Sequence, residues 1–497
     1  MRPAIDTSPG GWMRYIAPAA AIAILGFVGM PPGTAQEPTA ATAAAALEQT
    51  LVDAIEKAGK SVVAIARVDP WEAPRHGDRV QLRRSTPADA DFVPDHFGTG
   101  VVIDRGGFIL TQYHVVSEKS EHYVTTSDGK IYSARIHGAD PRSDLAILRI
   151  ISDSTPNLTA IRFGDASKLK RGQIVIALGN PYAIARDGQA SASWGIVANV
   201  SRKVPPGTSE GAGSAKDKLY HFGTLIQTDA KLNLGTSGGA LLNLKGEMIG
   251  LTTSLAATAG YEQAAGYAIP VDEVFVRAVE TMKRGDEVEY GFLGVVPETL
   301  ALGDQSKGTV GVRVSTVVPG TPADRSDLQT GDIITHVNER PIPDADSLIL
   351  QVGRKPVESL VRLTVLRESR PQSIEVKLTK FPVRGTKIVA SPPPSWRGLR
   401  VDYPTASMEE LQNVRNTESE LLRRGGVLIT EVQRDSPAWE AKLQPGMFIA
   451  DVSGQKVTSP REFRTAILGK NGSIELKIFG GDLIKGPETR VIRSSAR

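Results

Sequence analysis

The chain has no cysteine among its 497 residues. Disulfide bonds are therefore excluded, and each domain must be stable from side-chain packing alone. Histidine is also scarce, since only seven are scattered along the chain. Without thiols and without a histidine cluster, the sequence predicts no metal site and no cofactor.

The chain also has no large excess of positive or negative charge. Lysine and arginine number 58 against 55 aspartates and glutamates, which leaves a net charge of +3 and no basic tract. Nucleic acid is therefore not a favoured partner. The glycine-rich phosphate loop of ATP-driven machines is also absent. The length suggests about three domains rather than one core.

Long apolar runs are nearly absent, and the one candidate lies close to the N-terminus. Arg14 precedes an apolar run from Tyr15 to Met30, and small residues follow as far as Ala35. This pattern is typical of an export signal, cleaved before Gln36. The run is short for a membrane-spanning helix, which needs about 20 residues. We therefore expect a periplasmic or cell-envelope protein, with a retained N-terminal anchor as the alternative.

Three short segments carry the residue types of hydrolytic chemistry. They are TQYHVV around His114, DPRSDLAIL around Asp144 and GTSGGA around Ser237. The order His, Asp, Ser is that of a chymotrypsin-type triad. GTSGGA also fits the nucleophile elbow of α/β-hydrolases, but that elbow needs its acid and histidine downstream of the serine. Downstream of Ser237 the only histidine is His336, in a different sequence unit.

The chemistry accounts for each residue type. A serine hydroxyl is a weak nucleophile at neutral pH, so Ser237 needs a base, and His114 titrates in the right range. Asp144 would hold the imidazole in the correct tautomer. The backbone N–H groups of Gly235 and Ser237 would form the oxyanion hole.

Four segments resemble the HtrA/DegP-like family of bacterial serine proteases. They read FGTGVVIDRGGFILTQYHVV, SDLAILRI, IQTDAKLNLGTSGGALLN and AAGYAIP, and the resemblance extends over roughly residues 45–490. It implies a trypsin-like protease with two PDZ domains, assembled as a homotrimer or a multiple of trimers. The chain departs from the family's N-S-G-G-P motif, with Thr236 before the serine and Ala240 after the glycines. It also has Asn233-Leu234 in place of Asn-Pro.

The alternation of short β-branched runs with turn residues predicts a mainly β fold. Short β-branched runs begin at Ser61, and two sets of them flank the triad segments. They indicate a chymotrypsin-like double β-barrel followed by two PDZ domains of α+β type. The predicted segments are a signal peptide or anchor (1–35), a spacer and N-terminal helix (36–60), the protease domain (61–270), a connector helix (271–288), the first PDZ domain (289–383), a Pro-rich linker (384–395) and the second PDZ domain (396–493).

Within these segments, residues 36–46 read as a flexible spacer. Leu47, Leu51 and Ile55 mark one face of the helix that follows. Two other stretches, 69–97 and 203–218, read as mobile loops or as tolerated surface insertions.

An internal repeat supports the two PDZ domains. Gly311, Val312, Pro322 and Leu328 recur as Gly426, Val427, Pro437 and Leu443, and the offset is 115 throughout (426 − 311). The shared pattern resembles the middle of bacterial PDZ domains.

PDZ domains bind a peptide as an added strand, and backbone amides of one loop receive its terminal carboxylate. In the first copy this loop would be Phe292, Leu293, Gly294 and Val295, with Leu348 and Val352 on the pocket helix. The second copy offers Arg397–Val401 and has Met447 in place of Asp332, so we expect it to bind peptide less readily. Both units could instead serve as assembly or docking surfaces.

Substrate preference depends on the residue six before the serine, which lies at the pocket base in chymotrypsin-type enzymes. Here it is Lys231, beside Leu232, so cleavage after basic residues is not expected. The resemblance implies cleavage after small aliphatic residues.

The sequence therefore predicts an exported, ATP-independent serine endopeptidase of protein quality control, with unfolded or misfolded proteins as substrates. The alternative is a chaperone or PDZ scaffold in which proteolysis is latent or secondary.

Overall fold

The structure of the chain is a computed structural model. It describes residues 40–70, 89, 92–154, 156–180, 188–202, 224–253, 266–300, 308–382, 387–409, 423, 425–480 and 487–494. The predicted export segment 1–35, the loop 203–218 and most of 69–97 lie outside these residues. The described residues up to Glu48 belong to a different compact unit from those that follow.

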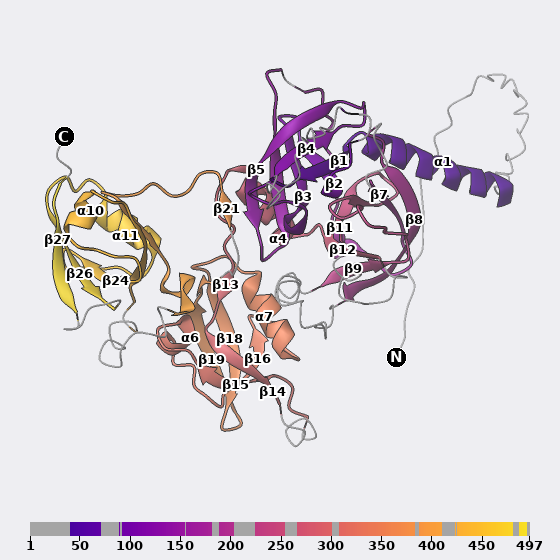
Figure 1. The fold of residues 1–497 in the computed structure, drawn as a ribbon. Coiled ribbons are helices and arrows are strands. Elements are labelled where there is room, and N and C mark those ends of the chain that lie inside the picture. Colours follow the sequence, from indigo (N-terminus) through magenta and orange to yellow (C-terminus); the bar gives the residue numbers. More distant parts are fainter. Residues whose placement is uncertain are drawn as a thin grey trace, which may run out of the picture. The chain divides into compact units, whose positions relative to one another are not determined.

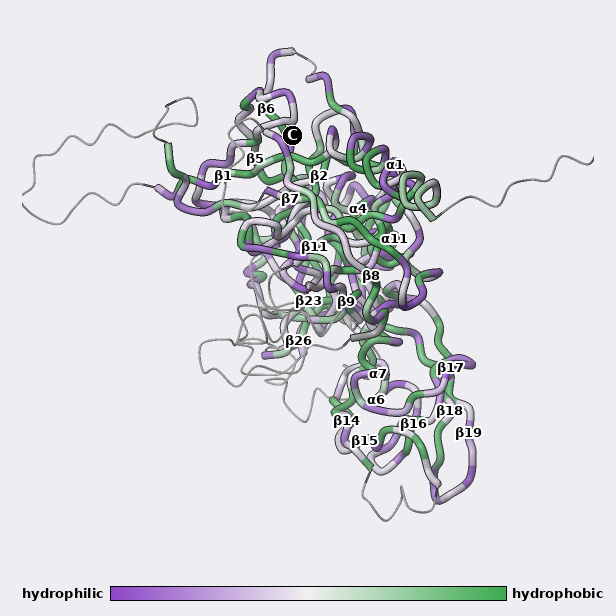
Figure 2. The backbone as a smooth tube through the Cα atoms, turned by 90° about the vertical axis from the view of Figure 1, so that its right-hand side faces the viewer, coloured by the Kyte–Doolittle hydropathy of each residue, from purple (hydrophilic) through white to green (hydrophobic). Residues whose placement is uncertain are grey.

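The first element, α1 (Ala40–Gly59), corrects one expectation. It begins inside the stretch 36–46 that was predicted to be a flexible spacer. That prediction is wrong from Ala40 onward, because the alanine run has the highest helix propensity and contains no helix breaker. In the second half of α1 hydrophobic and hydrophilic residues alternate (Figure 2). Ala54 and Ala58 are buried in the protease core, whereas Leu47 is exposed.

The first β-barrel consists of six strands (Figure 1). Their order is β5-β4-β1-β2-β3-β6, and pairing of β5 with β6 closes the barrel. The strands are β1 (Val62–Val68), β2 (His96–Asp104), β3 (Phe108–Gln112), β4 (Glu121–Thr125), β5 (Ile131–Asp140) and β6 (Leu145–Ile151). The predicted turns at Gly106-Gly107 and Asp128-Gly129 join β2 to β3 and β4 to β5, and Gly107 and Gly129 have positive φ.

The second barrel is also closed, in the order β10-β11-β12-β9-β8-β7. Its strands are β7 (Ile174–Gly179), β8 (Ser191–Arg202), β9 (Leu225–Thr228), β10 (Ala240–Leu242), β11 (Met248–Thr253) and β12 (Gly266–Pro270). A shared core joins Val101, Leu110 and Leu145 of the first barrel to Leu178 and Leu242 of the second. The structure therefore confirms the predicted mainly β, chymotrypsin-like double barrel. Short 3-10 turns lie at Tyr113–Val115, Ala166–Lys168 and Pro404–Ala406.

The helix after the second barrel, α4 (Glu273–Lys283), lies within the predicted connector segment. Asp272 caps it by accepting hydrogen bonds from the N–H groups of Val274 and Phe275. Its apolar face packs Phe275 and Met282 into the core that the two barrels share. The helix is thus part of the protease core as well as a connection.

Two six-stranded units follow. The first has β14 (Val295–Thr299), β15 (Val312–Val317), β16 (Ile333–Val337), β17 (Arg340–Pro341), β18 (Leu360–Arg367) and β19 (Arg370–Lys377), with α6 (Pro322–Arg325) and α7 (Ala345–Gly353). The second has β22 (Leu399–Asp402), β23 (Val427–Val432), β24 (Phe448–Val452), β25 (Gln455–Lys456), β26 (Ile474–Phe479) and β27 (Glu488–Ile492), with α10 (Pro437–Glu440) and α11 (Pro460–Ile467).

The two units share one topology. Their sheet orders, β14-β15-β16-β18-β19 and β22-β23-β24-β26-β27, correspond strand for strand. β15 and β23, α6 and α10, β16 and β24, and α7 and α11 begin 115 residues apart (427 − 312). The offset read from the sequence is therefore confirmed as a repeat of structure. β14 and β22 are edge strands, so each has one side open to an added strand.

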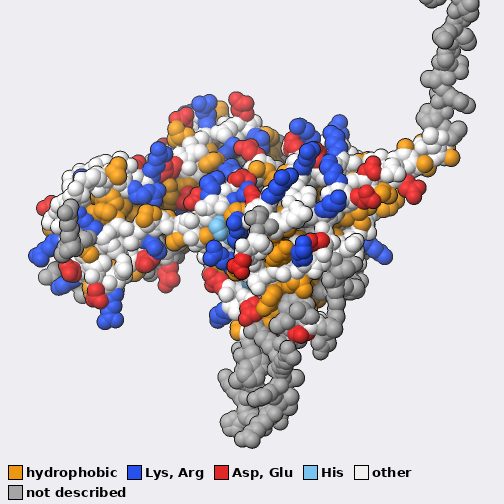
Figure 3. Space-filling model, turned by 90° about the horizontal axis from the view of Figure 1, so that it is seen from above, with side chains coloured by type: hydrophobic (Ala, Val, Ile, Leu, Met, Phe, Trp, Pro, Cys, Tyr) orange, Lys and Arg blue, Asp and Glu red, His pale blue; other side chains and the backbone are white. Residues whose placement is uncertain are grey.

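Short strands connect these units to their surroundings. β13 (Gly291–Phe292) pairs with β20 (Thr379–Lys380). β21 (Ile388–Val389), inside the predicted linker, pairs with β5 of the first barrel, so this part of the linker is not a free spacer. Lys and Arg are interspersed with Asp and Glu over the face in Figure 3, in keeping with the balanced charge count. No helix in the described part of the chain is long and apolar enough to cross a membrane.

Candidate active site and peptide grooves

His114 and Asp144 lie side by side in the first barrel. His114 is in the 3-10 turn after β3, and Asp144 directly precedes β6. The imidazole Nδ1 lies 2.8 Å from Oδ2 of Asp144, and the backbone N–H of His114 donates to Oδ1 at 3.1 Å. With its proton on Nδ1, the ring has Nε2 free to act as a base.

The Asp144 carboxylate is buried, with 1% of the residue exposed. Besides the His114 contacts, it accepts a hydrogen bond from Nε2 of Gln112 at 3.2 Å. Its backbone has φ of 56°, in the left-handed region, and its carbonyl accepts from the N–H of Tyr113 at 2.9 Å. These donors offset the cost of burying a carboxylate. Gln112 was missed by the sequence reasoning, although it stands only two residues before His114.

Ser237 lies in a turn that both barrels hold. Its carbonyl accepts from the N–H of Thr99 on β2 at 2.9 Å. The next residue, Gly238, donates its N–H to the carbonyl of Thr252 on β11 at 2.9 Å. Thr252 also donates its hydroxyl to the carbonyl of Thr236 at 2.5 Å. The serine segment is therefore fixed from the two sides of the barrel interface.

Two glycines in this turn have no room for a side chain. Gly235 has φ of 91°, and a Cβ there would lie 2.6 Å from the carbonyl oxygen of Asn180. Gly238 has φ of 83°, and its Cβ would lie 2.2 Å from the carbonyl oxygen of Thr99. The Thr99 hydroxyl donates to the carbonyl of Gly235 at 2.6 Å and accepts from the N–H of Asn180 at 2.8 Å. Thr99 is thus a positioning residue that the sequence reasoning missed.

The predicted pocket residues are only partly enclosed. Lys231 is exposed, and its carbonyl accepts from the hydroxyl of Ser193 at 2.8 Å. Leu232 is half-buried against Gly266, where a Cβ would lie 2.8 Å from its Cδ1. Residues 181–187 and 254–265 lie outside the described part, so the roles of Lys231 and Leu232 stay predictions.

The predicted peptide loop and pocket helix of the first PDZ unit lie together. Phe292–Val295, Leu348 and Val352 line a small cavity of about 60 Å³. Gly294 has φ of 89°, and a Cβ there would lie 2.1 Å from the Thr321 hydroxyl. Arg142, from the loop before Asp144, lines the same cavity. Nothing in the sequence pattern indicated that Arg142 would lie in this cavity.

In the second unit, Gly398 takes the place of Gly294. It has φ of 82° and lies against Ser436, as Gly294 lies against Thr321. The preceding Arg397 folds back, and its guanidinium donates to the carbonyls of Lys470, Gly472, Ile492 and Arg493. Arg397 therefore has a structural role.

Asp332 does not belong to the groove of the first unit. Its buried carboxylate pairs with Arg367 at 2.8 Å and accepts from the N–H of Gln329 at 2.9 Å. Its counterpart Met447 is buried in the core of the second unit. The exchange of Asp332 for Met447 therefore says nothing about peptide binding, although the sequence reasoning used it that way.

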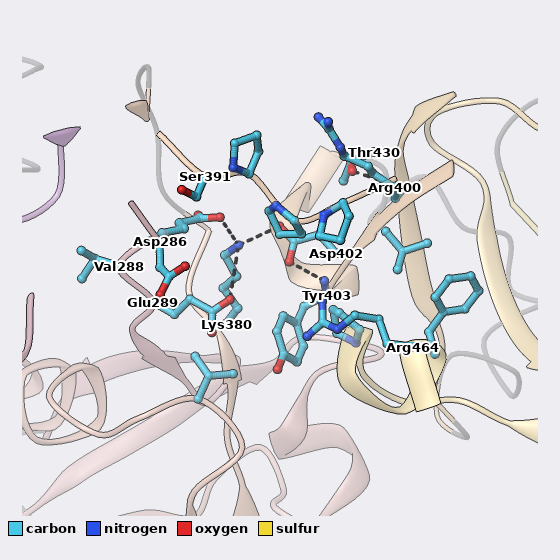
Figure 4. A pocket seen from close by; sticks show the side chains of 18 of the residues that line it. Asp286, Val288, Glu289, Lys380, Ser391, Arg400, Asp402, Tyr403, Thr430 and Arg464 are labelled. Atoms are coloured by element: carbon cyan, nitrogen blue, oxygen red, sulfur yellow. Dashed lines mark hydrogen bonds and ion pairs between the residues drawn. The ribbon is translucent and has the colours of Figure 1, made fainter. Parts of the chain in front are cut away.

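A larger hollow of about 850 Å³ borders the second unit (Figure 4). Leu399 and Arg400 on β22 and Phe463 on α11 line it, together with the proline-rich segment. At its edge the buried Lys380 pairs with Glu287 at 2.8 Å and Asp402 at 2.7 Å. Burial opposes the lysine's charge, but these carboxylates outweigh burial and raise the pKa of Lys380. Among the described residues, no cluster of three His, Asp or Glu could hold a metal ion.

Comparison with known proteins agrees with this architecture. The trypsin-like peptidase domain family matches residues 98–251, and the PDZ domain family matches residues 291–378. The periplasmic serine endoprotease DegP of Salmonella typhimurium is 32% identical over 391 residues, covering 78% of this chain and 74% of that protein. The periplasmic pH-dependent serine endoprotease DegQ of Escherichia coli is also 32% identical, covering 78% of each.

A solved structure of the HtrA-type protease AlgW with decapeptide superposes with a TM-score of 0.50 at 25% identity, covering 69% of this chain and 99% of that one. The double barrel, the domain matches and these relatives define a serine endopeptidase that carries a PDZ domain. The chain belongs to the DegP-like family of HtrA-type serine endoproteases.

Proposed function

We propose that this protein is an exported, ATP-independent endopeptidase of protein quality control that cleaves unfolded or misfolded proteins with His114, Asp144 and Ser237. The observation that carries the proposal is the 2.8 Å contact between Nδ1 of His114 and the buried Asp144 carboxylate. The Ser237 turn, which is hydrogen-bonded to both barrels, would supply the nucleophile.

The proposed reaction is acyl transfer by the three residues together. Nε2 of His114 takes the proton of the Ser237 hydroxyl as its oxygen attacks the scissile carbonyl. The backbone N–H groups of Gly235 and Ser237 stabilise the developing oxyanion, and Asp144 stabilises the imidazolium. His114 then protonates the leaving amine, and a water molecule releases the acyl-enzyme by the same steps.

The first PDZ unit is proposed to bind C-terminal peptides that end in an apolar residue. The open edge of β14 would take the peptide as an added strand, and Leu348 and Val352 would contact its last side chain. The second unit, which repeats the topology, is proposed to be a second PDZ domain. Its groove would correspond to the hollow beside β22 and α11.

Export and assembly belong to the same proposal. The relatives are named periplasmic, and the apolar run from Tyr15 to Met30 supports a periplasmic location for this chain. Family resemblance supports a homotrimer or a multiple of trimers.

The test is digestion of casein with sequencing of the products, comparing the wild-type protein with Ser237→Ala. We expect cleavage after small aliphatic residues by the wild type and none by the variant. A Ser237→Ala variant that still binds unfolded casein, beside a wild type that does not hydrolyse it, would favour the chaperone or scaffold alternative.

A further inference from the structure

One arginine of the protease barrel lies in the groove of the first PDZ unit. Arg142 precedes Asp144 by two residues, in the loop between β5 and β6. It is 3% exposed, and its guanidinium carbon lies 4.2 Å from the ring centroid of Tyr290 and 3.7 Å from that of Phe381. The two aromatic faces fix a cation beside the peptide loop.

This guanidinium has spare hydrogen-bonding capacity. Its Nε and Nη1 atoms are buried and have no hydrogen-bond partner among the described residues. The nearby Asp140 carboxylate is engaged by the hydroxyl of Tyr290 and the backbone N–H groups of Arg142 and Ser143. Buried donors without an acceptor are rare in folded proteins, and each calls for an explanation.

The cavity beside Arg142 is where a bound peptide would end. It is lined by Arg142, by the loop Phe292–Val295 and by Leu348 and Val352 of α7. In strand addition to a PDZ groove, the terminal carboxylate points at this loop. A guanidinium gives a carboxylate charge-assisted hydrogen bonds, which are stronger than those of the neutral backbone amides of the loop.

The end of α7 leaves space for the arginine. A Cβ at Gly353 would lie 2.8 Å from Nη2 of Arg142, and outside its own helix and chain neighbours no other described residue comes within 4 Å of that position. A side chain at Gly353 would therefore push against the guanidinium.

We propose that Arg142, contributed by the protease barrel, is the cationic residue of the first PDZ groove and pairs with the free carboxylate of a bound C-terminal peptide. This assignment rests on the proposed peptide binding of that groove. It makes the groove incomplete without the loop that also carries Asp144.

The test measures binding to the full chain in a Ser237→Ala background, so that the probe is not cleaved. The probes are a fluorescent ten-residue peptide ending in valine as the free acid and the same peptide as the C-terminal amide. A hydrogen bond to a charged group contributes enough binding free energy for the free-acid peptide to bind about 10-fold to 100-fold more tightly than the amide peptide. In Arg142→Met we expect the ratio to fall to the smaller preference that the loop amides alone give, with the affinity for the amide peptide unchanged.

Three further variants sharpen the test. Arg142→Lys should retain part of the preference, because it keeps the charge and loses the planar set of donors. Gly353→Ala should weaken the acid more than the amide by displacing the guanidinium. Arg362→Met, which removes an exposed charge from the same unit, should leave the ratio as in the wild type.

The outcomes separate two failures. If neither peptide binds the Ser237→Ala chain with Arg142 intact, the proposed peptide binding of the groove is wrong. If both bind and Arg142→Met keeps the wild-type ratio, or weakens acid and amide by the same factor, Arg142 is only a packing residue and the assignment is overturned.

Discussion

The hydroxyl of Tyr290, directly before β13, donates a hydrogen bond to the carboxylate of Asp140 at the end of β5. Both residues are buried. The same carboxylate accepts from the N–H groups of Arg142 and Ser143, which lead directly to Asp144. A residue that follows the last barrel strand in sequence therefore helps to hold the loop of the proposed catalytic acid.

Tyr290→Phe should lower the rate of cleavage. It leaves the buried Asp140 without one donor, which costs about 1–3 kcal/mol of stability, and it loosens the loop that ends at Asp144. A small displacement of a catalytic group can cost up to about 100-fold, so we expect kcat to fall about 10-fold on a short peptide substrate with little change in KM.

The matched control for this prediction is Tyr403→Phe, which removes a 3.0 Å hydrogen bond to the Glu358 carboxylate away from the barrels. It should leave kcat unchanged. Equal kinetic effects in both variants, or a change confined to KM, would show that Tyr290 does not position the loop.

The triad should behave as one unit. Ser237→Ala and His114→Ala should each reduce peptidase activity by several orders of magnitude with little change in folding, and the double variant should be no worse than either. Asp144→Asn should cost roughly 10⁴-fold, as the same change does in a serine protease triad. Initial rates on one peptide substrate measure all four. A double variant whose loss equals the product of the single losses would remove the assignment.

Two glycines allow strain and steric clash to be separated. Gly238 and Gly172 have φ of 83° and 88°, but a Cβ at Gly238 would strike the Thr99 carbonyl, whereas one at Gly172 would meet nothing within 4 Å. Gly172→Ala should therefore cost only the strain of the left-handed backbone, about 1 kcal/mol. Gly238→Ala should cost several times more and abolish cleavage. Thermal unfolding and peptide hydrolysis would show both, and equal unfolding temperatures would contradict the role of the contact.

Local sequence patterns predicted much of the fold. The β-branched runs around His114 and Ser237 could be recognised as strands because the pattern of a strand is contained in a few consecutive residues. The second C-terminal unit could be predicted because the same local motif recurs 115 residues later. The helix from Ala40 contradicts the predicted spacer because a run of alanines favours helix even where no apolar periodicity marks a buried face.

The contacts that the sequence did not reveal join distant segments. Thr99 meets Gly235, and Arg142 meets Tyr290 and Phe381, only after the barrels and the PDZ unit have packed. No periodicity or motif records such a pairing. Arg142 stands in the same motif as Asp144. Its burial in the groove of another unit depends on how the two units pack.

Stability of the first barrel should depend on pH through His122. This residue is 4% exposed, and its Nε2 accepts from the N–H of Ser117 at 3.3 Å. Burial and the positive charge of Arg67 lower the pKa of His122 to about 4, although the negative charge of Asp69 acts in the opposite direction. Because the unfolded chain binds this proton near pH 6.5, stability is full above that pH. It is lost as the pH falls towards 4, by up to about 2 kcal/mol between pH 7 and pH 5.

His122→Gln should flatten this dependence, whereas His336→Gln, in the sheet of the first PDZ unit, should leave it unchanged. Hydrogen exchange of the β1 and β4 amides at pH 7 and pH 5 reports the free energy of opening of this barrel. The neutral glutamine can still accept from Ser117 but cannot take up a proton. If the opening free energy of His122→Gln falls between pH 7 and pH 5 as steeply as that of the wild type, another group carries the proton linkage.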